Sequence, residues 1–167
     1  MAGFRPISAG GRTLLVGGAA VLLVSLFVLP WFQVSGTRPD LPPGTYDGLG
    51  STGLMNTLLN GPWGWIAFIW LVFLVFFAMG IAAIGRKTRH VGTVSIVILL
   101  LYALVLVVIP TYLSPQGSAD TVSVSFANGF VAAVLGAALI EGGARWPRTV
   151  RGRYERPTTA EWDDISV

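Results

Sequence analysis

The stretch Asn60–Gly85, NGPWGWIAFIWLVFLVFFAMGIAAIG, decides the fold class of this chain. It is a long apolar run that begins at a Trp-rich turn and ends at a basic cluster. No charged residue lies between Asp47 and Arg86. A helix needs about 20 apolar residues to cross the hydrocarbon core of a bilayer. The stretch therefore predicts a membrane-spanning helix, and the chain is predicted to be an integral membrane protein.

The composition agrees with this prediction. Of the 167 residues, 53% are hydrophobic and only 11% are charged, whereas soluble domains contain roughly 25% charged residues. The absence of cysteine excludes disulfides, thiolate metal sites and iron–sulfur clusters. A net charge of +3 is compatible with nucleic-acid binding, but the basic residues lie beside apolar runs, as in membrane proteins. We therefore expect no nucleic-acid partner.

Four apolar runs predict an all-α bundle of four transmembrane helices. The predicted spans cover residues 13–33, 62–84, 91–112 and 122–140. They form one predicted domain, 1–144, with a Gly- and Pro-rich outer loop at 35–61 and a cytoplasmic tail at 145–167. The first run also resembles a signal peptide, but it is longer than a usual signal core, so we expect it to be retained. Within the outer loop, residues 51–60 are predicted to form a short amphipathic helix on the membrane surface.

The distribution of basic residues predicts the orientation of these spans. One side of the predicted bundle has ten of the 11 basic residues, and the other side has Arg38 alone. The ten are Arg5, Arg12, Arg86, Lys87, Arg89, Arg145, Arg148, Arg151, Arg153 and Arg156. Because the basic side of a membrane protein is cytoplasmic, we expect both termini in the cytoplasm and a multi-pass protein of the plasma membrane.

An aromatic cluster near the start of the second span is a candidate contact site. Its members are Trp63, Trp65, Phe68, Trp70, Phe73, Phe76 and Phe77, and the first four are the predicted lipid or partner contacts. These side chains could form a stacking surface for a lipid or an apolar ligand, or an interfacial belt with packing against lipid or a partner. Trp70 lies deepest, where its indole N–H needs a hydrogen-bond acceptor.

Small residues recur on the fourth span. Gly129, Ala133 and Ala137 are spaced by four residues, and Gly18 lies in a similar run on the first span. Such ridges allow helix backbones to approach closely. The ridge is predicted to pack either within the bundle or against another subunit, and the pattern alone does not distinguish these alternatives.

Catalytic and metal sites are not indicated. No ionisable residue lies within the four predicted spans, so a proton-coupled transporter is disfavoured. His90 is the single histidine, whereas haem or metal sites need more ligands. Asp40, Asp47 and Asp120 lie in polar loops without a spacing motif. We therefore expect no enzyme activity and no cofactor.

Basic residues that flank the spans are predicted to contact anionic headgroups or a partner. They are Arg86, Lys87, Arg89, Arg145, Arg148 and Arg151, and Trp162 joins them from the tail. Membrane lipids and other integral membrane subunits are thus the expected partners.

Three short motifs resemble the tryptophan-operon-associated membrane proteins of actinobacteria, a group of small four-helix membrane proteins. The motifs are Pro30-Trp31-Phe32, placed at the predicted membrane interface, Arg153-Tyr154-Glu155-Arg156-Pro157, and Trp162-Asp163. The resemblance covers only these motifs and a Gly-rich outer loop. It implies a four-span topology and no particular activity.

These observations favour a non-catalytic accessory subunit of a larger membrane complex, respiratory or of the cell envelope. The alternative is a protein that binds a lipid or another hydrophobic ligand in a groove lined by Trp65, Phe68 and Trp70. The two hypotheses differ in what the purified protein retains: another polypeptide in the first case and a lipid in the second.

Overall fold

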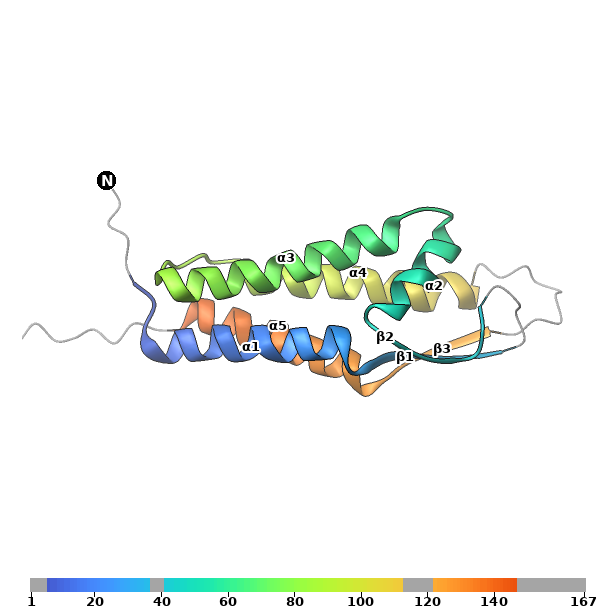
Figure 1. Cartoon of the computed structure of the whole chain (residues 1–167), viewed down its shortest axis with the longest axis horizontal. Coiled ribbons are helices and arrows are strands. Elements are labelled where there is room, and N and C mark those ends of the chain that lie inside the picture. The colour runs from blue at the N-terminus through green and yellow to red at the C-terminus, as the bar shows by residue number, and fades with distance from the viewer. Residues whose placement is uncertain (1–5, 37–40, 113–121, 147–167) are drawn as a thin grey trace, which may run out of the picture.

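The computed structural model describes residues 6–36, 41–112 and 122–146, and it shows four long helices with a small sheet at one end (Figure 1). The long helices are α1 (Ala9–Phe27), α3 (Trp63–Ile84), α4 (Val91–Tyr112) and α5 (Asn128–Arg145). The remaining elements are β1 (Pro30–Gly36), β2 (Gly44–Asp47), α2 (Gly50–Leu59) and β3 (Val122–Phe126). We call the end with the strands the sheet end. The opposite end, which includes Arg12, residues 85–90 and Arg145, is the basic end.

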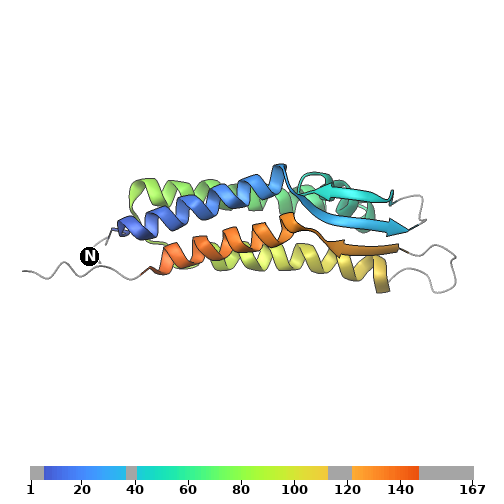
Figure 2. The ribbon, with the colours of Figure 1, turned by 90° about the horizontal axis from the view of Figure 1, so that it is seen from below.

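The four long helices form a ring in which α1 and α4 each contact both α3 and α5. Neighbouring helices run antiparallel, and α1 and α5 lie side by side along most of their length (Figure 2). Helices α1, α3 and residues Val91–Val108 of α4 are long and apolar enough to cross a membrane. The described part of the chain is therefore mostly helical, with three candidate spans.

The predicted boundaries of the second and third spans agree with α3 and α4, but those of the first and fourth are wrong. The first was expected to extend to Gln33, whereas α1 ends at Phe27 and β1 begins at Pro30. The fourth was expected to begin at Val122, whereas α5 begins only at Asn128. In both cases the segment next to the helix that was assigned to the span is a strand.

The prediction of an all-α fold is corrected by a three-stranded antiparallel sheet in the order β2-β1-β3. The central strand pairs Val34 with Val124 on one side and Gln33 with Thr45 on the other. Residues 122–126, Val-Ser-Val-Ser-Phe, alternate apolar and polar side chains, which favours a strand. The sheet thus joins two chain connections that are remote in sequence.

Trp31 was expected at headgroup level, and the structure buries its ring in the core of the molecule. Its side chain is 0% exposed, and its ring packs edge-on against Tyr102 and Phe130, with centroids 6.0 and 5.8 Å away. The indole Nε1–H donates to the carbonyl oxygen of Ser25 at 2.7 Å. This carbonyl belongs to the last turn of α1, where carbonyl groups have no partner within the helix. Trp31 therefore caps α1 while joining the sheet to the bundle.

Helices α1 and α5 approach so closely that glycine is required at their crossing. A Cβ atom at Gly18 would lie 2.6 Å from the carbonyl oxygen of Gly136, and one at Gly136 would lie 2.8 Å from that of Gly18. Gly11 and Gly143 form a second such pair. A Cβ atom at Gly11 would lie 2.9 Å from the carbonyl oxygen of Gly143, and one at Gly143 would lie 2.7 Å from that of Gly11. Both helices thus repeat the contact every seven residues, which corresponds to two helical turns.

The predicted ridge of small residues lies inside this interface region. Ala133 and Ala137 are fully buried, and a Cβ atom at Gly129 would lie 2.5 Å from the carbonyl oxygen of Pro30. These three residues therefore pack within the chain's own bundle.

The short helix expected at 51–60 is present as α2, but it packs against α3 and α4. Leu54 and Met55 are its buried apolar residues. The side chain of Asn56 accepts a hydrogen bond from the backbone N–H of Gly64 at 2.8 Å. A Cβ atom at Gly64 would lie 2.3 Å from the carbonyl oxygen of Thr52. Helix α2 is thus part of the tertiary structure at the sheet end.

Candidate functional site

The outward face of α3 is the most distinctive surface of the described chain. Helix α3 buries Phe68, Leu71, Val75 and Ala78 towards the bundle. Its opposite face exposes large aromatic side chains, each about half accessible. They are Trp63, Trp65, Trp70, Phe73, Phe76 and Phe77. In the part of α4 whose side chains the structure describes, residues 91–108, the exposed large side chains are by contrast aliphatic: Val94, Val97, Leu100, Leu101 and Leu104.

Part of this face forms a seam with alternating spacings of three and four residues. The seam consists of Trp63, Ile66, Trp70, Phe73, Phe77, Gly80 and Ile84. Such spacing keeps side chains on one side of a helix and is typical of helix–helix packing. Phe73 and Phe77 stack within it, with ring centroids 6.0 Å apart and planes inclined by 9°.

The four aromatic residues singled out from the sequence do not share one groove. Phe68 is buried, where its ring meets Phe27 edge-on at 5.5 Å. Trp65 is exposed outside the seam and packs edge-on against Phe68, with ring centroids 6.3 Å apart. Trp63 and Trp70 are seven residues apart and line a common groove. The structure therefore brings Trp63 and Trp70 together and separates them from Trp65 and Phe68.

That groove, here called the sheet-end groove, lies between α2, α3 and α4 and has a volume of about 280 Å³. Its walls are almost entirely apolar and include Met55, Leu101 and Val105. Tyr102 also lines it, and its hydroxyl group lies 2.8 Å from the Ser51 hydroxyl. The sequence offered no signal for this groove, since α2 and α4 meet only through tertiary packing.

Trp70 is 54% exposed beside this groove. Its ring contacts Phe73 edge-on at 5.9 Å. Among residues 6–36, 41–112 and 122–146, none accepts a hydrogen bond from its Nε1–H. Within the same residues, every buried polar side-chain atom has a hydrogen-bond partner. Trp70 therefore presents an apolar ring and an unused donor on the outside of the bundle.

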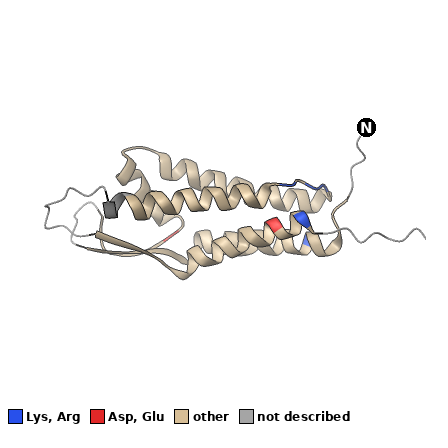
Figure 3. Cartoon of the chain, turned by 180° about the vertical axis from the view of Figure 1, so that it is seen from behind, with Lys and Arg blue, Asp and Glu red and all other residues tan. Residues whose placement is uncertain are grey.

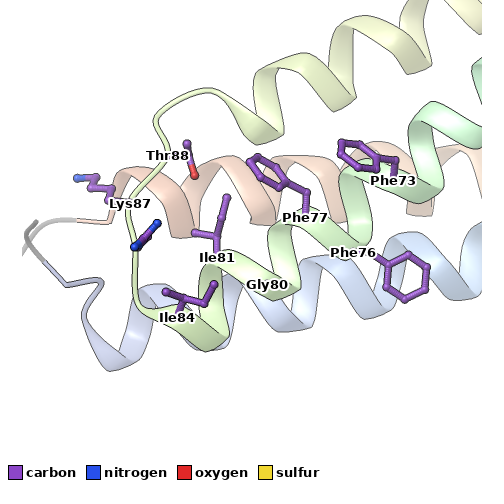
Figure 4. A pocket seen from close by; sticks show the side chains of 9 residues that line it. Phe73, Phe76, Phe77, Gly80, Ile81, Ile84, Lys87 and Thr88 are labelled. Atoms are coloured by element: carbon purple, nitrogen blue, oxygen red, sulfur yellow. The ribbon is translucent and has the colours of Figure 1, made fainter.

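A second hollow, the basic-end groove, follows the other half of α3 and has a volume of about 580 Å³. Phe73, Phe76, Phe77, Gly80, Ile81 and Ile84 form its apolar walls, and Arg86, Lys87 and Thr88 line its end. In Figure 4 the rings of Phe73 and Phe77 lie along one side of α3, and Lys87 and Thr88 lie beyond its last turn. The groove thus changes from apolar to basic along its length.

The predicted basic contact residues that the structure describes all lie at the basic end. Figure 3 shows the lysine and arginine residues of the described chain gathered there. Arg86, Lys87, Arg89 and Arg145 are exposed. The other predicted contacts, Arg148, Arg151 and Trp162, lie outside the described residues, as do Asp40 and Asp120.

Glu141 lies near the basic end and links α5 to the start of α4. Its Oε2 atom accepts a hydrogen bond from the backbone N–H of Thr93 at 2.7 Å. Its Oε1 atom pairs with Arg145 one turn later. The N–H groups of a first helical turn have no partner within the helix, and a carboxylate is favourable beside them. Glu141 therefore caps α4 from a neighbouring helix.

Replacing Glu141 with leucine is expected to lower the free energy of unfolding by about 1–2 kcal/mol, the usual cost of losing a helix cap. The measurement is thermal unfolding in detergent, followed by circular dichroism. Glu141→Gln retains an amide oxygen as acceptor, so its free energy of unfolding should fall less than that of the leucine variant. Equal stability of the leucine variant and the parent protein would contradict the capping role.

Within the described ranges 6–36, 41–112 and 122–146, no three His, Cys, Asp or Glu side chains come together as possible metal ligands. His90 is exposed at the basic end. No protein-family model matches this chain, and no curated protein matches it. The α3 face and its two grooves are therefore the candidate site.

Proposed function

We propose that this chain is a non-catalytic accessory subunit of a larger protein complex in the plasma membrane, and that the sheet-end part of the α3 seam, Trp63, Ile66 and Trp70, packs against a helix of another subunit. All four long helices cross the bilayer in this proposal. Helix α5 has 18 residues, or about 27 Å at roughly 1.5 Å per residue, close to the hydrocarbon thickness of about 30 Å. The basic end lies in the cytoplasm with both termini, in accordance with the positive-inside rule.

The single observation behind this proposal is the environment of Trp70. Trp70 follows Trp63 by seven residues, which places it about 10 Å deeper along α3. With Trp63 at the membrane interface, the Trp70 indole lies in hydrocarbon, where an unpaired N–H is costly. Lipid chains have no acceptor for it, whereas a backbone carbonyl or a polar side chain of a partner helix does. The seam spacing and the exposed aromatic rings support the same partner.

The small, apolar sheet-end groove suits a side chain of a partner helix. Its volume of about 280 Å³ is close to the lower limit of the roughly 300–1,000 Å³ typical of ligand pockets. A large side chain from a facing helix fits such a groove, as knobs fit holes between packed helices. The groove thus supports an accessory subunit more directly than a binding protein for a separate hydrophobic molecule.

The test is the assembly state of Trp70 variants extracted in a mild detergent and measured by native mass spectrometry. The parent protein is expected in a complex with a second polypeptide. Trp70→Phe removes only the N–H, so the complex should weaken about fivefold, because hydrogen bonds between membrane helices contribute about 1 kcal/mol. Trp70→Ala removes a central aromatic anchor and should cost at least about 2 kcal/mol of binding.

The matched control is Trp65→Phe, which removes an exposed indole N–H outside the sheet-end groove. It should leave the complex unchanged. A parent protein that remains a stable monomer in mild detergent would contradict the proposal. Equal loss of assembly in the Trp65 and Trp70 variants would also contradict it, because the effect would then not depend on the seam. If the chain associates only with a second copy of itself, the proposed partner, a different subunit, is excluded.

A further inference from the structure

We infer that the basic-end groove binds one anionic phospholipid, with an acyl chain along the apolar wall and the phosphate group beside Lys87. This goes beyond the proposed subunit role, because it concerns the opposite half of α3 and a lipid ligand. It also differs from the lipid hypothesis based on Trp65, Phe68 and Trp70, which do not share a groove. The inference does not depend on which side of the membrane the basic end occupies.

The apolar wall has the length and the open space that an acyl chain needs. From Phe73 to Ile84 the helix advances about 16 Å, at roughly 1.5 Å per residue. Gly80 leaves a notch in this wall, since a Cβ atom placed there would meet no atom within 4 Å. The groove volume of about 580 Å³ lies within the range typical of ligand sites.

The polar end of the groove is suited to a negative headgroup. Arg86, Lys87 and Thr88 follow directly after the last turn of α3 and line the groove. Thr88 adds a hydroxyl group that can donate to a phosphate oxygen. The nearest acidic side chain of the described chain, Glu141, already accepts hydrogen bonds from Thr93 and Arg145. Lys87 therefore gives this end of the groove a positive charge.

An anionic phospholipid matches both halves of the groove at once. Basic pockets beside transmembrane helices recognise anionic lipid headgroups through this combination of charge and apolar surface. A free phosphate ion would leave the aromatic wall unused. A purely apolar partner helix would offer no counter-charge to Lys87.

The experiment measures lipid retention by the full-length protein in detergent. The protein is incubated with phosphatidylglycerol or phosphatidylcholine of identical acyl chains, and bound lipid is counted by native mass spectrometry. One phosphatidylglycerol should be retained at least about tenfold more strongly than phosphatidylcholine. Gly80→Leu fills the notch and should abolish this preference. Gly17→Leu is the matched control, because a Cβ atom at Gly17 would also meet no atom within 4 Å, yet Gly17 lies exposed on α1.

A second pair of variants tests the charge. Lys87→Gln should weaken phosphatidylglycerol retention about fivefold. Arg89→Gln removes the same charge from the same connection but outside the groove lining, and should have a smaller effect. Equal retention of both lipids would overturn the inference and indicate annular lipid only. Retention that survives Gly80→Leu, or a polypeptide cross-linked at Gly80 in place of lipid, would overturn it as well. A negative result in these lipid-retention experiments would not change the outcome of the Trp70 assembly test.

Discussion

Replacing Gly18 with leucine is expected to prevent formation of the native bundle. The Cβ atom alone would lie 2.6 Å from the carbonyl oxygen of Gly136 and 2.8 Å from the backbone nitrogen of Ile140. These are backbone atoms, so relief requires α1 and α5 to separate along their whole contact. Overpacking of a core costs about 1–3 kcal/mol when side chains can adjust. For Gly18→Leu we expect the free energy of unfolding to fall by more than about 3 kcal/mol, because neither backbone can move alone.

The measurement is the midpoint of thermal unfolding in detergent, together with the yield of folded protein. Gly18→Ala, the mildest form of the change, should lower the midpoint by several degrees, at roughly 2–4 °C per kcal/mol. Gly17→Ala is the matched control, since a Cβ atom at Gly17 meets no atom within 4 Å. The unfolding midpoint of this control should rise slightly, because alanine is more favourable than glycine within a helix by about 1 kcal/mol. Equal midpoints for the two alanine variants would contradict the close crossing of α1 and α5.

The second large effect is expected at Trp31. Trp31→Ala removes a fully buried indole that contacts Phe32, Tyr102 and Phe130. Truncation of a buried aromatic side chain to alanine costs about 3–5 kcal/mol. It also leaves the Ser25 carbonyl at the end of α1 without its donor. The sheet end should therefore loosen first, visible as faster hydrogen exchange of the β1 and β3 backbone amides.

Two comparisons separate the contributions of Trp31. Trp31→Phe retains most of the ring but loses the N–H donor, so it should cost only about 1 kcal/mol plus the small volume change. Trp65→Ala removes an indole that is about half exposed and should have a much smaller effect on unfolding. If Trp65→Ala and Trp31→Ala shift unfolding equally, Trp31 is not the residue that joins the sheet to the bundle.

Much of the helical architecture was predictable because membrane helices have a strong local signal. The second and third spans were predicted within a residue of α3 and α4, since both are continuous apolar runs with basic residues between them. The first and fourth spans were predicted with wrong boundaries for the same reason. A strand with apolar residues directly beside an apolar helix resembles a continuation of that helix. The alternation of apolar and polar residues in Val122–Phe126 was the one local feature that distinguished this strand from the helix α5.

The candidate site was predicted only in part. Its residue types and the helix that presents them were visible in the sequence. The sequence did not show which of the aromatic residues are buried and which line each groove, because this depends on which side of α3 faces α1 and α4. Periodicity shows that a helix has two faces, but a helix that is apolar all round does not indicate which face is buried.

By itself, the sequence determined that the chain has long apolar helices, that basic residues collect at their ends, and that glycine and alanine favour close helix contact. These properties follow from local composition and spacing. Only the tertiary structure decided that Gly18 meets Gly136, that Trp31 is buried at the junction of sheet and bundle, and that α3 presents two grooves. Each of these features requires side chains or backbones that are remote in sequence, and local patterns do not encode which remote segments will pack together.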